Sequence, residues 1–259
     1  MDRIIRIFPT PQALSESLAL DLVSQIRVAG AGVNHFTIAL SGGNTPKLLY
    51  SVLADQYAAS VTWSNVHFFW VDERCVPPDD PESNFGMTND AFLHRIDIPA
   101  GNIHRIRGED DPGKEAERYS VEISEFTIKK GGMPFFNVIF LGLGEDGHTA
   151  SIFPGNEKLF ATDKICVMAI HPSTGQKRIT ITGRVIDNSA EIIFMVTGKN
   201  KAGIVNNIIG SGDNKKQYPA SYVSPAEGVV VWYLDEEAAL LTKRLRKDET
   251  AKLHNRITA

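Results

Sequence analysis

The chain has 259 residues, of which 42% are hydrophobic and 22% charged, so it holds enough apolar material for one large α/β domain or two small ones. Its formal net charge of −4 argues against general binding to nucleic acid, although a few local cations can still hold a small anion. Two distant cysteines, and the lack of a signal-like or membrane-spanning apolar run, predict a cytoplasmic protein that enters no membrane.

The N-terminal part of the chain alternates apolar runs with amphipathic segments. IIRIF is typical of a strand, and TPQALSESLALDLVSQI predicts a helix that Thr10 caps, with Pro11 in its first position. FTIAL (36–40) predicts a buried strand. The turn SGGN then leads to a second helix, for which Thr45 is the expected cap.

The middle of the chain continues this alternation. VHFFWV (66–71) predicts a strand, and the proline-rich DERCVPPDDPESN after it predicts an irregular loop. Ser83 or Asn84 is expected to cap the next helix, and GKEAERYSVEISEFTI (113–128) predicts another. FFNVIFLGLG is typical of a strongly apolar strand.

The C-terminal part adds strands at ICVMAIH, EIIFMVTG (191–198) and GVVVWYL, and Lys177 and Arg178 precede a further strand in GQKRITIT. NKAGIVNNII predicts a helix, and DEEAALLTKRL (235–245) predicts a last one. Strands that alternate with helices favour an α/β fold of three layers around a mainly parallel sheet. No linker divides the chain, so we expect a single domain over residues 1–259.

Polar residues follow the ends of the four strongest strands, in the segments SGGNT, DER, EDGH and TGKNK. Ligands of open parallel sheets bind beyond the carboxyl ends of the strands, so we expect these segments to form one pocket. Glycines and a helix N-terminus suit an anion, and a lysine at a helix start is favourable only beside one. The candidate ligand-binding residues are Ser41, Gly42, Gly43, Asn44, Thr45, Asp72, Arg74, Arg178 and Lys199.

GLGEDGH carries the spacing G-x-G-x-x-G, which is typical of dinucleotide-binding turns. Such a turn needs a helix of about three turns after it, whereas Pro154-Gly155 interrupts the pattern here. The acidic side chains of Glu145 and Asp146 would also repel a pyrophosphate. We therefore interpret the segment as something other than a cofactor turn. On the residues alone, Asp146 and His148 are equally compatible with a catalytic pair and with a plain Asp-Gly turn.

The sequence contains no motif that is typical of a metal site or of a serine hydrolase. The remaining histidines are scattered, without an HExxH or CxxC pattern, and G-x-S-x-G is absent. We expect neither a metal nor a cofactor.

In their order along the chain, LSGGNTP, WVDERCVPPDDPESN, LGLGEDGHTASIFPG and MVTGKNKA resemble the 6-phosphogluconolactonase family. This family belongs to a superfamily that includes glucosamine-6-phosphate isomerase/deaminase. The resemblance implies a modified Rossmann-like fold. It also implies hydrolysis of 6-phospho-D-glucono-1,5-lactone to 6-phospho-D-gluconate in the oxidative branch of the pentose phosphate pathway.

The resemblance also implies roles for matching positions. His148 would be the general base, with Asp146 beside it, and the SGG turn, Arg74, Arg178 and Lys199 would surround the phosphorylated substrate. The match of Arg178 is open because Lys177 precedes it. No cofactor, metal or obligate protein partner would be required.

Two other functions stay open at this point. One is a sugar-phosphate isomerase/deaminase, and the other is a non-catalytic regulator that binds a sugar phosphate. The isomerase relatives place a glutamate where Phe153 stands here, and a phenyl ring cannot relay a proton. A regulator would usually carry an added interaction segment, and we find none in the sequence. Both observations favour the hydrolase.

Overall fold

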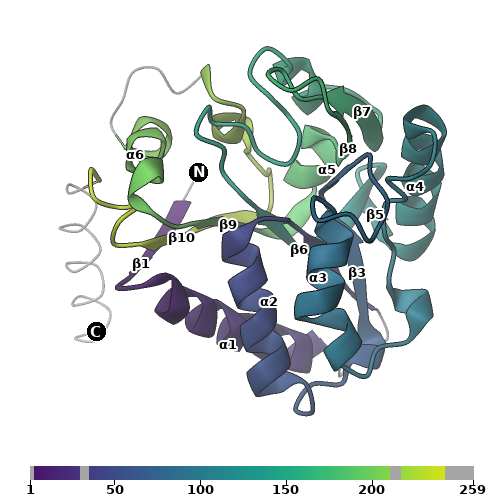
Figure 1. Ribbon diagram of the computed structural model, residues 1–259, viewed down its shortest axis with the longest axis horizontal. Coiled ribbons are helices and arrows are strands. Elements are labelled where there is room, and N and C mark those ends of the chain that lie inside the picture. The colour runs from purple at the N-terminus through teal and green to yellow at the C-terminus, as the bar shows by residue number, and fades with distance from the viewer. Residues whose placement is uncertain (1–2, 30–34, 211–216, 243–259) are drawn as a thin grey trace.

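The computed structural model describes residues 3–29, 35–210 and 217–242, and these residues are built around a mainly parallel sheet (Figure 1). Six strands lie in the order β1-β10-β9-β6-β2-β3, and every neighbouring pair among them is parallel. Their bounds are Arg3–Phe8 (β1), Val229–Asp235 (β10), Ser189–Val196 (β9), Met133–Leu141 (β6), Phe36–Leu40 (β2) and Val66–Trp70 (β3). A short β5 (Ile128–Lys130) joins β6 in antiparallel orientation. The predicted fold class is confirmed.

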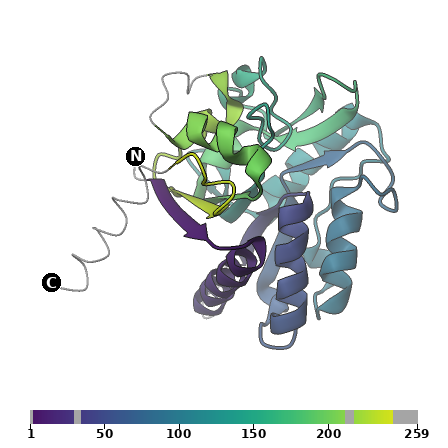
Figure 2. The same cartoon turned by 60° about the vertical axis from the view of Figure 1, so that its left-hand side comes forward.

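Helices flank this sheet and supply the rest of the core. α1, α2 and α3 lie next to one another in both views (Figures 1 and 2). Strands β2 and β3 are buried along their whole length, which explains why their sequences are largely apolar. The helix bounds are Pro11–Ala29 (α1), Asn44–Tyr57 (α2), Asn84–Ala91 (α3), Pro112–Phe126 (α4), Gly183–Asp187 (α5) and Ala202–Ile209 (α6). No helix in the described part of the chain is long and apolar enough to cross a membrane.

A second, antiparallel sheet was not predicted from the sequence. It has the order β4-β8-β7, with bounds Asp72–Arg74 (β4), Lys177–Ile181 (β8) and Cys166–Ile170 (β7). Thus DER is a short strand and not part of an irregular loop. Val71 joins the two sheets, because its N–H donates to Leu40 of β2 and its carbonyl accepts from Ile181 of β8.

Two predicted helix starts are confirmed, and one is wrong. The Thr10 hydroxyl accepts from the Ala13 N–H at 3.1 Å, and the Ser83 hydroxyl accepts from the Gly86 N–H at 3.0 Å. Thr45 is not a cap, because α2 already begins at Asn44. The preceding Gly43 has a φ of 105° and turns the chain into the helix.

The expected helix at 235–245 is also not observed where the structure describes it. Residues 236–241 form turns, and residues 243–245 lie outside the described part. The Asp235 carboxylate accepts from the Ala238 N–H at 2.7 Å, as a helix cap would, and also from the Gly198 N–H at 3.0 Å. This arrangement ties the end of β10 to the loop after β9.

Candidate active site

The four segments that follow the strongest strands meet in one pocket of about 220 Å³. The predicted residues that line it are Ser41, Gly42, Asp72, Arg74, His148 and Arg178. The other lining residues were not proposed as ligand-binding residues from the sequence: Asn84, Gly142, Leu143, Gly144, Ala150 and Lys201. The pocket lies at the carboxyl ends of the parallel strands, where the topology predicts a site.

The turn after β2 approaches the start of α3 very closely. A Cβ atom on Gly42 would lie only 1.8 Å from the Asn84 Oδ1 atom, so a side chain cannot be accommodated there. The Asn84 amide donates to the carbonyl oxygen of Asp72 at 2.9 Å. The sequence indicated Asn84 only as a helix cap, because this contact joins segments about 40 residues apart in the chain.

The remaining predicted residues of this turn do not line the pocket. Gly43 and Asn44 begin α2. The Thr45 hydroxyl lies 2.7 Å from that of Thr197, so it links the turn after β2 to the loop after β9.

Asp72 is a buried carboxylate in the lining of the pocket. It accepts from the Ser151 hydroxyl at 2.6 Å and forms a 3.9 Å ion pair with Arg178. The Asp72 and Arg178 side chains are only 8% and 12% exposed, respectively. Asp72 therefore holds the loop after β6 and strand β8 together, in addition to facing the pocket.

Two guanidinium groups stand next to each other on the second sheet. Arg74 of β4 is paired directly with Arg178 of β8. Burial, with the nearby positive charge of Arg74, lowers the pKa of Arg178. The Nε atoms of both arginines are buried without a hydrogen-bond partner among the described residues. Such an arrangement is electrostatically suited to an anion.

The turn after β6 holds His148 against Asp146. The Nδ1 atom of His148 lies 2.6 Å from Asp146 Oδ1, which also accepts from the His148 backbone N–H at 3.1 Å. If Nδ1 carries the proton, as this contact requires, Nε2 is left with its lone pair. A Cβ on Gly144 would lie 2.1 Å from His148 Nδ1, and Gly147 has a φ of 81°. Both glycines are thus needed for this turn.

Asp146 does not line the pocket directly, but it is placed to act through His148. Partial burial alone would raise the pKa of Asp146, yet the hydrogen bonds from His148 and the charge of its imidazole lower the pKa below the usual range. The carboxylate is therefore ionised near neutral pH. It can orient the imidazole and stabilise its protonated form.

The lysine in the pocket wall is Lys201, whereas Lys199 is exposed and does not line the pocket. Both belong to a single 3₁₀ turn, Lys199–Lys201, that precedes α6. With three residues per turn, positions two apart point in different directions. The sequence motif predicted Lys199 because it does not record which side chain of this turn points into the pocket.

The structure also bears on cofactors and metals. No helix follows Gly147, since residues 148–156 form turns and isolated bridges, so the dinucleotide interpretation fails. In the described ranges, no group of three or more His, Cys, Asp or Glu side chains is arranged to hold a metal ion.

Comparison with known proteins identifies the family of the chain. The profile of the family described as glucosamine-6-phosphate isomerases/6-phosphogluconolactonase matches residues 9–232. The chain belongs to this family. It is 43% identical to the 6-phosphogluconolactonase of Haemophilus influenzae over 90% of this chain and 97% of that protein. It is 38% identical to the one of Synechocystis sp. over 88% and 93%. The predicted resemblance is confirmed.

Solved structures place the chain on the 6-phosphogluconolactonase branch of the family. The structure of the Trypanosoma brucei 6-phosphogluconolactonase superposes with a TM-score of 0.84 at 31% identity, covering 92% of this chain and 98% of that one. A monomeric glucosamine-6-phosphate deaminase superposes with a TM-score of 0.77 at 24% identity, which shows a shared fold alone.

Proposed function

We propose that this member of the 6-phosphogluconolactonase family hydrolyses 6-phospho-D-glucono-1,5-lactone to 6-phospho-D-gluconate, with His148 as the general base. The observation that carries the mechanism is the His148–Asp146 pair at 2.6 Å, on the wall of a pocket that also presents two incompletely paired guanidinium groups. Hydrolysis of a phosphorylated lactone requires a general base and cationic groups that bind the phosphate.

In this mechanism a water molecule attacks the lactone carbonyl carbon while Nε2 of His148 takes its proton. The imidazolium is stabilised by the ionised Asp146, and collapse of the tetrahedral intermediate breaks the ring ester bond. The ring oxygen leaves with a proton, and His148 is the nearest donor once it has been protonated. The histidine thus ends the cycle neutral, and no covalent intermediate is needed.

The developing oxyanion needs donors that are free in the resting enzyme. The N–H groups of Gly144 and Gly147 are engaged, because they donate to the carbonyls of His148 and Gly144 at 2.9 and 3.0 Å. Unpaired N–H donors remain on Arg74 and Arg178. This favours a guanidinium as the oxyanion partner over these two glycine N–H groups.

The substrate phosphate is assigned to the cationic side of the pocket. Arg74 belongs to β4 and Lys201 to the 3₁₀ turn before α6, and the N-terminus of α2 directly follows the SGG turn. Lys199, which the sequence suggested, is exposed beside this wall. We therefore propose Lys201 as the lysine that contacts the phosphate.

Phe153 supports hydrolysis over isomerisation. Its ring is buried and lies 4.9 Å from the His148 ring, between centroids, where isomerase relatives carry a glutamate. A phenyl ring provides packing for the imidazole but no proton relay. A lactone needs no ring opening before attack, so hydrolysis loses nothing by this replacement.

The direct test is acid release from freshly generated 6-phosphogluconolactone, corrected for spontaneous hydrolysis. The purified protein should accelerate this release, and it should not convert glucosamine 6-phosphate to fructose 6-phosphate and ammonia. Acid release no faster than the uncatalysed background would refute the activity. Ammonia production would assign the protein to the isomerase branch instead.

A further inference from the structure

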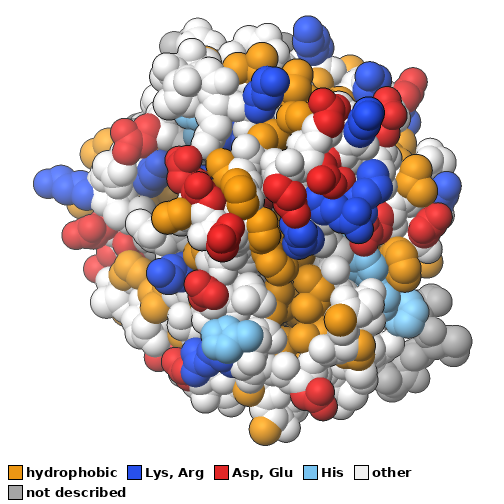
Figure 3. Space-filling model, turned by 45° about the vertical axis from the view of Figure 1, so that its right-hand side comes forward, with side chains coloured by type: hydrophobic (Ala, Val, Ile, Leu, Met, Phe, Trp, Pro, Cys, Tyr) orange, Lys and Arg blue, Asp and Glu red, His pale blue; other side chains and the backbone are white. Residues whose placement is uncertain are grey.

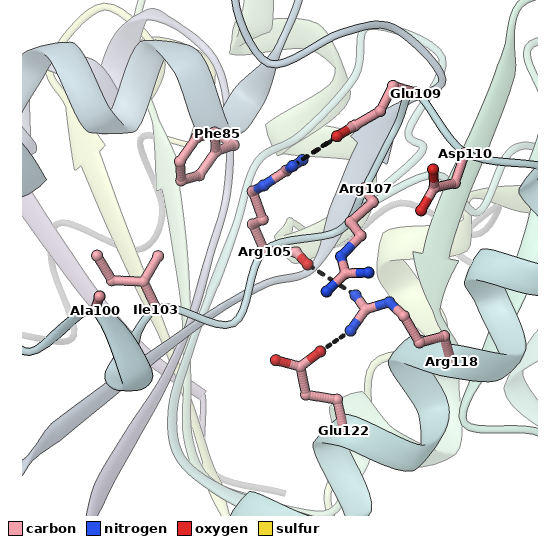
Figure 4. A pocket seen from close by; sticks show the side chains of 9 residues that line it. All are labelled: Phe85, Ala100, Ile103, Arg105, Arg107, Glu109, Asp110, Arg118 and Glu122. Carbon is pink, nitrogen blue, oxygen red and sulfur yellow. Dashed lines mark hydrogen bonds and ion pairs between the residues drawn. The ribbon is translucent and has the colours of Figure 1, made fainter.

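Arginines of this protein that lie near a carboxylate form direct ion pairs with it, with one exception among the described residues. The face turned forward in Figure 3 carries a compact group of basic side chains against acidic ones. Figure 4 shows two direct contacts: Arg105 donates to Glu109 at 2.6 and 2.9 Å, and Arg118 donates to Glu122. The other arginine ion pairs in the described ranges are equally direct, apart from that one exception.

The exception is the pair of Asp72 and Arg178 in the lining of the candidate active site. The Asp72 Oδ2 and Arg178 Nη1 atoms are 3.9 Å apart, whereas a charge-assisted hydrogen bond would be about 2.7–2.9 Å long. Both side chains are almost buried, so water screens their attraction only weakly, and the attraction favours closure. The Nε atom of Arg178 is also buried without a hydrogen-bond partner. Another contact must therefore hold the carboxylate away from the guanidinium.

The Ser151 hydroxyl makes this contact. It donates at 2.6 Å to Asp72 Oδ2, which is the oxygen that faces Arg178. The other carboxylate oxygen, Oδ1, has a longer contact of 3.4 Å with the amide of Asn84. Ser151 is fully buried and does not line the pocket. Its effect on a substrate therefore passes through Asp72.

The position of Ser151 is fixed by a tight turn in the loop after β6. The Ile152 N–H donates to the Thr149 carbonyl at 3.0 Å, and the Ser151 N–H donates to the Thr180 hydroxyl at 3.2 Å. Ala150 in this turn has a φ of 49°, a left-handed conformation that is unfavourable for an L-residue with a side chain. Such a conformation persists only where the surrounding contacts impose it, and it is common next to functional sites. The serine hydroxyl is thus held in one place.

We propose that Ser151 is a positioning residue that keeps the Arg178 guanidinium open for the negative charge of the substrate. Its hydroxyl binds the Asp72 oxygen that would otherwise accept from Arg178. Asp72 then balances the charge of the guanidinium in the resting enzyme without consuming its N–H donors. This inference rests on the proposed function, because it takes the phosphorylated substrate to be the anion that Arg178 binds.

The first test needs no ligand. Ser151→Ala removes the hydroxyl, so a crystal structure of this variant should show the distance between Asp72 Oδ2 and Arg178 Nη1 shortened from 3.9 Å to about 2.8 Å. The unsubstituted protein, crystallised under the same conditions, is the control and should keep the open pair. A distance that stays near 3.9 Å in Ser151→Ala would overturn the inference, whatever the substrate is.

The second test is calorimetric titration of the full-length protein with 6-phospho-D-gluconate, which carries both a phosphate and a carboxylate. Ser151→Ala should raise its dissociation constant about tenfold, because Arg178 must then leave a closed ion pair before it binds the ligand. Ser189→Ala is the matched control and should leave the dissociation constant unchanged. Ser189 is also buried, its hydroxyl donates to the Ile186 carbonyl at 2.8 Å, and it lies outside the pocket.

The outcomes of this titration separate the inference from the proposed function. An unchanged dissociation constant in Ser151→Ala would overturn the inference alone. No binding of 6-phospho-D-gluconate by the unsubstituted protein would instead count against the proposed function. Ser151→Cys keeps the size of the side chain but donates only weakly, so it should raise the dissociation constant less than Ser151→Ala does. It provides the same test if the alanine variant does not fold.

A double substitution distinguishes positioning from a general loss of structure. Asp72→Asn removes the negative charge that closes onto Arg178. In this background, adding Ser151→Ala should therefore change the dissociation constant of 6-phospho-D-gluconate less than about twofold. A serine that only stabilised the loop would cause the same tenfold loss in both backgrounds, and this result would overturn the inference.

Discussion

The contact between His148 and Asp146 makes a quantitative prediction through a double-mutant cycle. His148→Asn removes the only imidazole in the pocket lining, and general-base assistance is usually worth about 10²–10⁴-fold, so kcat should fall by that factor. Asp146→Asn keeps the shape but removes the charge that stabilises the imidazolium. The side chains are 29% and 44% exposed, so solvent weakens the contact, and about 1–2 kcal/mol, or roughly 5- to 30-fold in kcat, is expected.

The sharper expectation is that the two losses do not add. If Asp146 acts only through the imidazole, Asp146→Asn should change kcat less than about twofold in the His148→Asn background. The assay is acid release from 6-phosphogluconolactone above the spontaneous rate, with kcat and KM separated. His171→Asn is the matched control, because His171 also packs against Phe153, with ring centroids 5.0 Å apart, but does not line the pocket.

Two results would refute this reasoning. Near-normal kcat in His148→Asn would remove the histidine from the mechanism. Full additivity of the two substitutions would show that Asp146 acts on something other than the imidazole. Circular dichroism and urea denaturation of each variant keep a folding defect from being mistaken for either result.

Three further predictions concern binding and stability. Lys201→Ala should lower kcat/KM for the phosphorylated lactone about tenfold or more, with little effect on kcat/KM for glucono-1,5-lactone. Lys199→Ala is the control variant. Equal losses in the Lys201→Ala and Lys199→Ala variants would contradict the assignment. Glu73→Gln should lower the free energy of unfolding, measured in urea, by about 2–3 kcal/mol. The buried Glu73 carboxylate accepts four hydrogen bonds, and the NH₂ group of a glutamine would face one of these donors. A decrease below about 0.5 kcal/mol would refute this. Burial, with charged neighbours, lowers the pKa of both His67 and His104 to about 4. As the pH falls below about 6.5, these histidines are therefore protonated in the unfolded chain before they are in the folded one. The free energy of unfolding should be highest above about pH 6.5 and fall by roughly 3 kcal/mol or more toward pH 4, more steeply than in His67→Gln.

The parallel sheet was predictable because its strands are apolar along their whole length. FTIAL and VHFFW are buried along their whole length, although β3 is the last strand of the order, and such runs are typical of parallel strands between helices. The position of the site followed from topology, since the carboxyl ends of parallel strands meet at one edge. The segments SGGNT, DER and EDGH needed only to follow such strands in order to be brought together.

The second sheet could not be predicted from local sequence. β4 has three residues, all charged, so neither apolar content nor alternation distinguishes it from a loop. Its partner β8 lies about 100 residues further along the chain, and the pairing depends on Val71 joining both sheets. Lys201 and Asn84 were missed for a related reason. Their places in the pocket depend on the rotation of a 3₁₀ turn and on a contact with Gly42, which motif spacing does not record.

The register of the second sheet explains why such a weak strand exists at all. Like charges directly opposite on neighbouring strands destabilise a sheet, yet the pairing of β4 with β8 places Arg74 against Arg178. The Glu73 carboxylate compensates by accepting from backbone N–H groups of Arg74, Asn84 and Phe85 at 2.8 Å, which fixes β4 to the start of α3. Local rules of stability are commonly violated where a ligand restores the balance. Two half-buried arginines with buried, unpaired Nε atoms form such a violation, and in the function that we propose the phosphorylated substrate supplies the negative charge that resolves it.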